Sequence, residues 1–583
     1  MKLLSNIYIN IMAGLLLASQ CGCNKITDLK PINEISDAAY WKTPDQFRLA
    51  ANEFYPYLRT FTDVISDNPH ADVRSDLITG TAKNAFSNGN NTLSITDGNW
   101  NAGYTRLRAI NYLLDKAATY PAAADIANYV AEAKYFRAYV YFDLLQQFGE
   151  VPLIDKPLGV NAEELQAPRN KRNEVVDFII KDLEDAITVL PLESAIVAAS
   201  KGRISKGAAQ AMLARVSLYE GTWQKFRNGD ATRYNSLLDK AITNSDAVIS
   251  SAQYQLFAPP QLGDSAQKYM FILEDQKSNP ANLTKSSNKE YILANRYDFN
   301  LRQIRFNVTH TVVNNLLWIT RKFANLYLCQ DGLPVEISPL FQKYGTARSE
   351  YGSRDNRMKY TMMIDTNYYW DNENPGARTT WQSDSADRKN SRGKHNAAAN
   401  SGYANQKWGT ERRLNDQEEA YDYPVIRYAE VLLIYAEAKF ERDGMISDAD
   451  LNKSLNLVRN RVNKGMPKLS NALVTGNGLD MRTEIRRERT IEFYLEGFRI
   501  DDLKRWKTAE TEMPMPLLGI KWKGTEFETR WKVNGAAPYP LDADGNLILE
   551  SGRKWSEKNY LYPVPTQQIQ LNANLAPNNT GWN

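Results

Sequence analysis

The sequence predicts a mainly α-helical protein: a tetratricopeptide-like helical scaffold with an inserted loop-rich, irregular ligand-binding lobe. Three observations carry this prediction. Apolar residues recur at steps of three and four in a series of segments, which is the period of one helix face. Successive helices form units of roughly 30 to 40 residues in which small and aromatic residues alternate, as in tetratricopeptide packing. Between about residues 255 and 420 this rhythm is lost.

The helix predicted over 122–148 is central, because it is apolar around most of its circumference and must pack on more than one side. Gly149 ends it, and Pro152 prevents the helix from resuming. Glu132 and Arg137 fall within this apolar helix, where an unpaired charge is costly, so each is expected to have a partner.

The remaining elements follow in order. Thr43 as N-cap and Pro44 at the first helical position begin the first helix, and residues 62–99 are rich in turn formers and predict an irregular region. Further helices are predicted at 100–118, 173–190, 204–219, 234–251, 425–440, 455–462 and 481–494, followed by a loop-like tail. This divides the folded chain into a helical part (41–254), a loop-rich lobe (255–420) and a second helical part with the tail (421–583).

Residues 1–22 predict a signal peptide, with a basic start and an apolar core too short to span a bilayer. The cysteines that follow suggest a bacterial lipoprotein, with Cys23 as the acylated residue because Gly22 precedes it; Cys21 remains an alternative. Residues 23–40 then form the lipid anchor and tether. We expect the protein to be anchored in a membrane rather than to span it.

Composition removes several function classes. The 71 Lys and Arg nearly balance the 68 Asp and Glu, so bulk charge gives no case for nucleic acid. The three histidines have no metal-ligand spacing, and no acidic loop has the ordered ligand spacing of a calcium site. We therefore expect no metal and no cofactor.

Charged residues are densest between 485 and 506, where Glu488, Glu492 and Glu496 are four residues apart and should repel one another. Arginines of the same stretch could pair with them: Arg486, Arg489, Arg499 and Arg505. A pair of these carboxylates acting as acid and base would need unequal environments. We therefore interpret the cluster as a structural ion network.

Taken together, these segments resemble the SusD/RagB-like nutrient-binding outer-membrane lipoproteins over nearly all of the mature chain. The matching pieces are Cys23 with Asp28 and Pro31, WKTP at 41–44, the W-x3-Y-x5-IN pattern at 100–111, EAKYFRA at 132–138, FGEVP at 148–152, GRISKGAA at 202–209, RYAEVLL with AEA at 427–438, ER at 488–489, EGFR at 496–499, DLKRW at 502–506 and YPVP at 562–565. Their order makes the set specific, and roughly 371–401 is the part without a match.

The resemblance implies a non-enzymatic protein on the outside of a Gram-negative outer membrane. Such proteins look like lids on SusC-like TonB-dependent transporters, to which they pass captured oligosaccharide or, in some members, peptide. It also implies that ligand is bound by the irregular segment before Trp100 and by the mid-chain lobe, the two regions where helical periodicity is lost.

Sugar recognition needs an aromatic face for the ring and planar polar groups for hydroxyls. The candidates are Asp76, Asn90, Asn91 and Asn99 in the first region and Tyr297, Tyr369, Trp370 and Trp381 in the second. Asp76 could equally cap a helix. Trp100, Trp318 and Trp408 are expected in the core.

Two other classes stay open at this point. A glycoside hydrolase needs a carboxylate pair in a cleft, and no pair flanked by aromatic residues is evident. A protein-interaction scaffold without its own small ligand is compatible with tetratricopeptide-like helices and can coexist with ligand capture.

Overall fold

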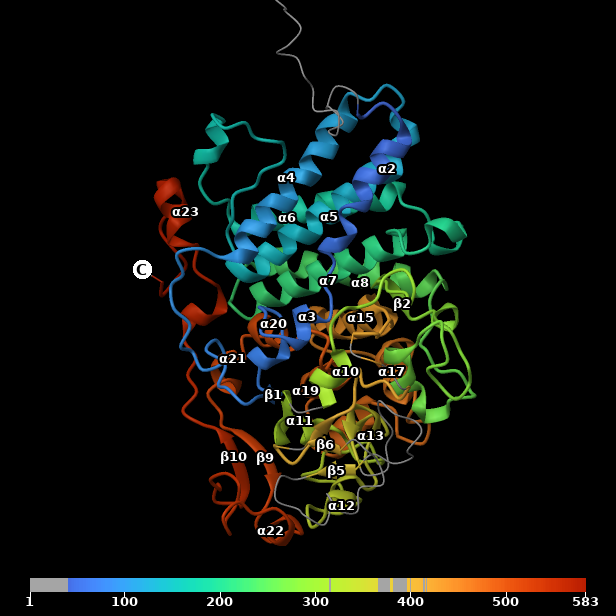
Figure 1. Ribbon diagram of the computed structural model, residues 1–583, viewed down its shortest axis with the longest axis vertical. Helices are drawn as coiled ribbons and strands as arrows, with labels where there is room; N and C mark the ends of the chain where they lie inside the picture. Colours follow the sequence, from blue (N-terminus) through green and yellow to red (C-terminus); the bar gives the residue numbers. More distant parts are fainter. Residues whose placement is uncertain are drawn as a thin grey trace, which may run out of the picture.

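The computed structural model describes residues 40–313, 316–364, 378–380, 396–398, 400–412, 415 and 417–582. A stack of long helices forms the upper half of the molecule in Figure 1, and a region of short elements lies below it. The predicted signal peptide, Cys21, Cys23 and nearly all of the tether lie outside the described residues. Within the described residues, no helix has the length and apolar character needed to cross a membrane.

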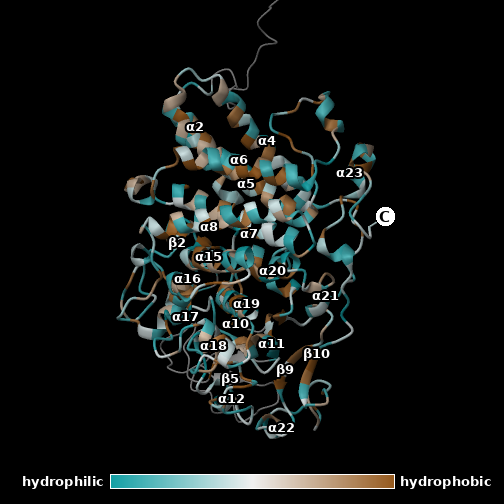
Figure 2. Ribbon diagram, turned by 180° about the vertical axis from the view of Figure 1, so that it is seen from behind, coloured by the Kyte–Doolittle hydropathy of each residue, from teal (hydrophilic) through white to brown (hydrophobic). Residues whose placement is uncertain are grey.

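The upper stack confirms the predicted helices of the first helical part. Its members are α2 (Pro44–Asn52), α4 (Gly98–Ala118), α5 (Ala123–Phe148), α6 (Arg172–Val189), α7 (Lys206–Lys225) and α8 (Ala231–Ser250). Each of α4 to α7 packs against the next helix in the chain. The helices mix hydrophobic and hydrophilic residues along their length (Figure 2), as expected for elements that each bury only part of their surface.

The central helix α5 has its two buried charges paired, as the sequence requires. Glu132 accepts two hydrogen bonds from the Arg203 guanidinium, at 2.8 and 2.6 Å. Arg137 binds both oxygens of Asp182, at 2.7 and 2.8 Å. These ion pairs connect α5 to α6 and to the segment before α7, so the charges align neighbouring helices.

Residues 62–99 are irregular, as predicted, with only α3 (Thr62–Ile65) and β1 (Ile78–Thr79) as regular elements besides short 3-10 turns and the start of α4. The mid-chain region is likewise a series of short elements: α9 (Ala266–Tyr269), β2 (Tyr291–Asn295), α10 (Val308–Val313), β3 (Trp318–Ile319), α11 (Arg321–Leu326), α12 (Ala347–Tyr351), α13 (Met358–Thr361), β4 (Met362–Met363), β5 (Arg378–Thr380), β6 (Asn396–Ala398) and β7 (Ala404–Asn405). Antiparallel pairing of β1 with β3 joins these two irregular regions.

The chain then returns to the helical stack, which makes the scaffold discontinuous in sequence. Strand β8 (Tyr423–Arg427) pairs antiparallel with β2 and leads directly into α15 (Tyr428–Asp443), which packs on α7 and α8. The predicted helix start at residue 425 is therefore wrong. Val425 and Ile426 are apolar because they fill a buried strand, and a short apolar run does not distinguish a strand from a helix.

The C-terminal part contains more regular structure than the loop-like tail that was predicted. Its elements are α16 (Asp448–Lys453), α17 (Leu455–Asn460), α18 (Asn471–Gly476), α19 (Met481–Glu492), α20 (Arg499–Arg505), α21 (Ala509–Glu512), β9 (Leu517–Lys521), α22 (Phe527–Arg530), β10 (Asn546–Glu550) and α23 (Thr566–Leu571). Strands β9 and β10 pair antiparallel with two irregularities of register. The 24 residues that separate these strands in the sequence hid the hairpin, because short hairpin loops are the ones that sequence signals identify.

The charge cluster is a buried ion network, but the partners of its glutamates differ from the prediction. Glu488 and Glu492 bind Arg357, Glu492 and Glu496 bind Arg427, and further cations are Arg461 at Glu492 and Lys407 at Glu496. The local arginines face elsewhere: Arg489 and Arg505 bind Asp502, Arg499 binds Asp76, and Arg486 lies over the Trp506 ring. Three of the local arginines are taken up by Asp502 and Asp76, so side chains of the mid-chain region, of β8 and of Arg461, directly after α17, supply the charge to the glutamates.

Candidate ligand-binding site

Asp76 lies in the interior with 1% of its surface exposed. Its carboxylate binds Arg499 at 2.7 Å and Lys322 at 2.5 Å. Burial raises the pKa of Asp76, but the two cations outweigh burial and hold the pKa well below its ordinary value. Both oxygens already bind cations, so its place in the structure does not favour the predicted ligand contact, and it caps no helix here.

The three predicted asparagines lie on the irregular segment before α4 and at its first turn. Asn90 is exposed, whereas Asn91 and Asn99 are half-buried. The Asn91 side chain accepts a hydrogen bond from Asn559 Nδ2 at 2.7 Å, which ties the segment to the C-terminal part. The backbone N–H of Asn99 donates to the N-cap residue Asp97 at 2.8 Å. None of these asparagines lines one of the larger cavities described below.

The mid-chain candidates are only partly described. Tyr297 is 8% exposed and packs against Phe61, with the Arg302 guanidinium 4.7 Å from its ring centre. Tyr369, Trp370 and Trp381 lie outside the described residues. Among the described residues, the predicted set therefore does not converge on one site. Trp100, Trp318 and Trp408 are buried, as expected.

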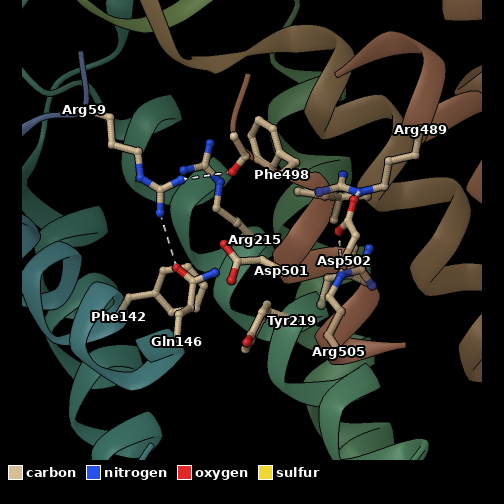
Figure 3. A pocket seen from close by; sticks show the side chains of 13 residues that line it. Arg59, Phe142, Gln146, Arg215, Tyr219, Arg489, Phe498, Asp501, Asp502 and Arg505 are labelled. Atoms are coloured by element: carbon tan, nitrogen blue, oxygen red, sulfur yellow. Dashed lines mark hydrogen bonds and ion pairs between the residues drawn. The ribbon is translucent and has the colours of Figure 1, made fainter. Parts of the chain in front are cut away.

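One enclosed polar pocket lies where α5, α7 and α20 meet, and Figure 3 shows its lining. Its volume is about 20 Å³, enough for about one water molecule. Four arginines surround it together with two aspartates: Arg59, Arg215, Arg489, Arg505, Asp501 and Asp502. A pocket of this size holds no sugar or peptide, so it belongs to the ionic interior.

Beside this pocket, His70 connects the irregular segment to the helical stack. Its Nδ1 lies 2.6 Å from Asp501 and its Nε2 lies 2.8 Å from Asp143. Burial and the nearby Arg59 lower the pKa of His70, but Asp501 and Asp143 outweigh them, so the pKa lies above its ordinary value. A protonated imidazole donates to both carboxylates and holds residues 66–76 on the scaffold.

A groove between α4 and α23 has a volume of about 680 Å³, within the usual range of small-molecule sites. The loop 152–167, which runs from the end of the α5 segment toward α6, forms its third wall. The lining residues are Trp100, Asn101, Tyr104, Thr105, Leu107, Arg108, Pro152, Ile154, Lys156, Leu158, Glu164, Leu165, Gln166, Ala167, Gln568, Leu571, Asn572 and Leu575. We call it the α4–α23 groove.

Direct hydrogen bonds fix the walls of this groove relative to one another. Tyr104 Oη donates to the Pro152 carbonyl at 3.0 Å, and Arg108 Nη1 donates to the Leu158 carbonyl at 2.6 Å. From the other side, Asn572 Nδ2 donates to the Ala167 carbonyl at 2.8 Å. The groove is therefore pre-formed, which lowers the entropy lost when a ligand binds.

The groove combines the two kinds of group that recognise sugars. The half-buried Tyr104 ring lines it, with the ring of the buried Trp100 packed against Tyr104 at a ring-centre distance of 5.2 Å, and the amides of Asn101, Gln166 and Gln568 are planar donors and acceptors. Sequence reasoning missed this site because Trp100, Tyr104 and Leu107 occupy one helix face, which looks like an ordinary core stripe. Nothing local shows that α23, more than 450 residues later, leaves part of that face uncovered.

Family comparisons identify the chain. The model of the SusD family matches residues 274–582, more than half of the chain, and a second model, described as "Starch-binding associating with outer membrane", matches residues 55–218. The protein belongs to the SusD family. The mainly helical, tetratricopeptide-like scaffold is the fold of that family.

Curated relatives and solved structures agree with this assignment. The chain is 25% identical to "SusD-like protein P2" of Formosa agariphila, covering 97% of this chain and 98% of that protein. It is 23% identical to a SusD-like protein of Bacteroides ovatus, over 81% and 77% of the two chains. A SusD-like carbohydrate binding protein from Bacteroides fragilis has the same fold, with a TM-score of 0.72 at 21% identity, over 92% of this chain and 99% of that chain.

Proposed function

We propose that this protein is a cell-surface, lipid-anchored protein that captures oligosaccharide and delivers it to a SusC-like TonB-dependent transporter in the outer membrane. Capture involves binding without catalysis. Cys23 carries the lipid, and residues 23–40 hold the body at the membrane surface.

The observation that carries capture is the α4–α23 groove. It is pre-formed, and its lining includes the half-buried Tyr104 ring and several side-chain amides, which together suit a sugar ring and its hydroxyls. Family membership supports the same function, since the matching model names starch binding and the Bacteroides fragilis relative is described as carbohydrate binding. Trp370 and Trp381 of the mid-chain lobe remain predicted contacts for a longer glycan.

The test is calorimetry and affinity electrophoresis of the protein lacking residues 1–23 against a panel of polysaccharides and peptides. Gln568→Ala removes an amide that lines the groove. Gln567→Ala is the matched control, because Gln567 directly precedes Gln568 in α23 and does not line the groove. We expect at least a threefold loss of glycan affinity for the first variant and none for the control. Equal affinities would refute the groove as the site, and Trp370→Ala and Trp381→Ala then test the mid-chain lobe.

The same experiment separates the alternative functions. Release of reducing sugar would overturn the non-catalytic assignment. Binding of peptides but no glycan would change the ligand class while keeping the architecture. If no ligand binds and the protein still co-purifies with the transporter, it is an interaction scaffold.

A further inference from the structure

A separate cavity, of about 410 Å³, is strongly basic. It lies between α2, the 199–203 segment before α7 and the end of β2. Its lining includes five cationic residues and no carboxylate: Arg48, Lys201, Arg203, Arg296 and Arg302. We call it the basic cavity. Cationic side chains gathered around a concave surface raise the local potential and attract anions.

Three of these cations have carboxylate partners that lie outside the lining. Arg203 binds Glu132 of α5 at 2.6 Å, and Lys201 binds Glu193 at 3.0 Å. Arg48 binds the exposed Asp45 at 2.7 Å, a contact of little energetic weight at the surface. The partners therefore balance part of the charge of the cavity without lining it.

Arg296 and Arg302 have no ion-pair partner among the described residues. Arg296 Nη1 donates to the Lys201 carbonyl at 2.5 Å, and Arg302 Nη1 donates to Asn295 Oδ1 at 2.8 Å and to the Arg296 carbonyl at 2.6 Å. Both side chains are exposed, and both stay charged at any physiological pH. The nearby Asp422 forms its ion pair with Lys285, at 2.7 Å, and acts on Arg296 only electrostatically.

The position of Arg296 depends on a glycine. Gly202 has φ +97°, and a Cβ added there would lie 2.7 Å from Arg296 Cδ. The Arg296 side chain therefore lies directly across the backbone at Gly202, where the hydrogen bond to Lys201 holds it. Such a held guanidinium loses less entropy on binding an anion than a free one.

We propose that the basic cavity binds the sulfate or carboxylate group of an acidic saccharide, with Arg296 and Arg302 as its anchors. A guanidinium fork matches the two-oxygen geometry of these groups, which gives short, charge-assisted hydrogen bonds. The cavity volume suits a sugar-sized unit, and its concave shape is poorly suited to the flat surface of a membrane. The choice of a saccharide rests on the proposed function, whereas the anion chemistry does not.

The experiment uses two pairs of probes that differ only in charge: a sulfated galactan with its desulfated form, and oligogalacturonate with its methyl ester. Binding of inorganic sulfate and of phosphatidylglycerol vesicles is measured in the same way. The test variant is Arg296→Gln/Arg302→Gln. Arg233→Gln/Arg442→Gln is the control, because it removes the same charge from ion-paired arginines on α8 and α15.

We expect at least one charged probe to bind tenfold or more tightly than its neutral counterpart, with a tenfold loss in the test variant and less than a twofold loss in the control. The dependence of affinity on salt should flatten in the test variant, since fewer cations take part. Thermal unfolding of both variants checks that they are folded.

Four outcomes overturn the proposal: equal affinity for charged and neutral probes, equal losses in the two variants, binding of vesicles or inorganic sulfate without either saccharide, and no binding of any anionic probe. The neutral glycan panel with Gln568→Ala is measured on the same proteins. If the wild-type protein binds the neutral glycan but no anionic probe, only the basic cavity is refuted. If it binds charged saccharides as expected but Gln568→Ala leaves neutral binding unchanged, only the proposed groove is refuted.

Discussion

Replacing Arg427 with methionine tests whether the buried ion network holds the mid-chain region on the helical scaffold. The Arg427 side chain is 2% exposed and sits at the end of β8. It contacts three carboxylates: Glu496 at 2.7 Å, Glu492 at 2.7 Å and Glu290 at 2.9 Å. Methionine has a similar length and no charge, so the change removes the charge with little change of volume.

The expected loss of stability follows from the carboxylates that remain after Arg427 is replaced. Glu290 and Glu492 keep Arg461, at 2.9 and 2.5 Å, whereas the one cation left at Glu496 within the described part of the chain is Lys407, at 2.6 Å. Removing one member of a buried ion pair destabilises a protein by about 3–5 kcal/mol, because the remaining charge is uncompensated. For a chain of 583 residues that corresponds to a decrease in the melting temperature of about 2–4 °C.

The assay is urea unfolding followed by circular dichroism, together with scanning calorimetry. Arg442→Met is the matched control, since Arg442 binds Asp239 at 2.9 Å with both side chains more than one third exposed, and about 1 kcal/mol or less is expected. Adding Glu496→Gln to Arg427→Met should restore part of the loss, because it removes the least compensated carboxylate. Losses for Arg427→Met and Arg442→Met that agree within about 1 kcal/mol would refute the reasoning.

Three further predictions concern pH and backbone. His70→Gln should reduce the melting temperature most below about pH 6.5. The effect should shrink as the pH rises through the raised pKa of the native imidazole, because the neutral ring no longer stabilises the folded state through its two ion pairs. A pH-independent difference between the two proteins contradicts this. Burial raises the pKa of Glu419 to about 7, so the contribution of this carboxyl to stability should fall by about 1.4 kcal/mol per pH unit between about 4.5 and 7. Glu419→Gln should remove that contribution to the slope, and parallel profiles of the two proteins would refute it. Gly497→Ala places a methyl group 2.6 Å from Val64 at φ +75° and should lower the free energy of unfolding by about 2–3 kcal/mol. The control, Gly444→Ala, has φ +72° but open space around the new methyl group and should lower it by about 1 kcal/mol. Equal losses would show that the contact with Val64 is relieved.

Within the described residues, helix existence was predictable because it depends on local spacing. The α5 stripe and the need for partners at Glu132 and Arg137 were both visible in the sequence, and the structure confirms them. The start of α15 was misplaced because Val425 belongs to a strand whose partner, β2, lies about 130 residues earlier. Apolar character predicted burial there, but the pairing partner decided the conformation.

The candidate site was predicted less well, for a related reason. Residue types and loss of helical periodicity pointed to two irregular regions, and pairing of β1 with β3 does bring these regions together. However, the α4–α23 groove arises where α23 leaves part of the α4 face around Tyr104 uncovered. No pattern within α4 distinguishes a face covered by protein from one that is left open to a ligand.

By itself, the sequence determined the helical scaffold, the discontinuous arrangement of its two helical parts and the family, because periodicity and ordered motifs are local properties of the chain. Only the tertiary structure decided which cations neutralise Glu488, Glu492 and Glu496, and that Arg296 and Arg302 share a cavity without a carboxylate. Those outcomes depend on side chains that are distant in sequence and become neighbours only on folding. Electrostatic partners are chosen by distance in space, and one sequence shows distance only along the chain.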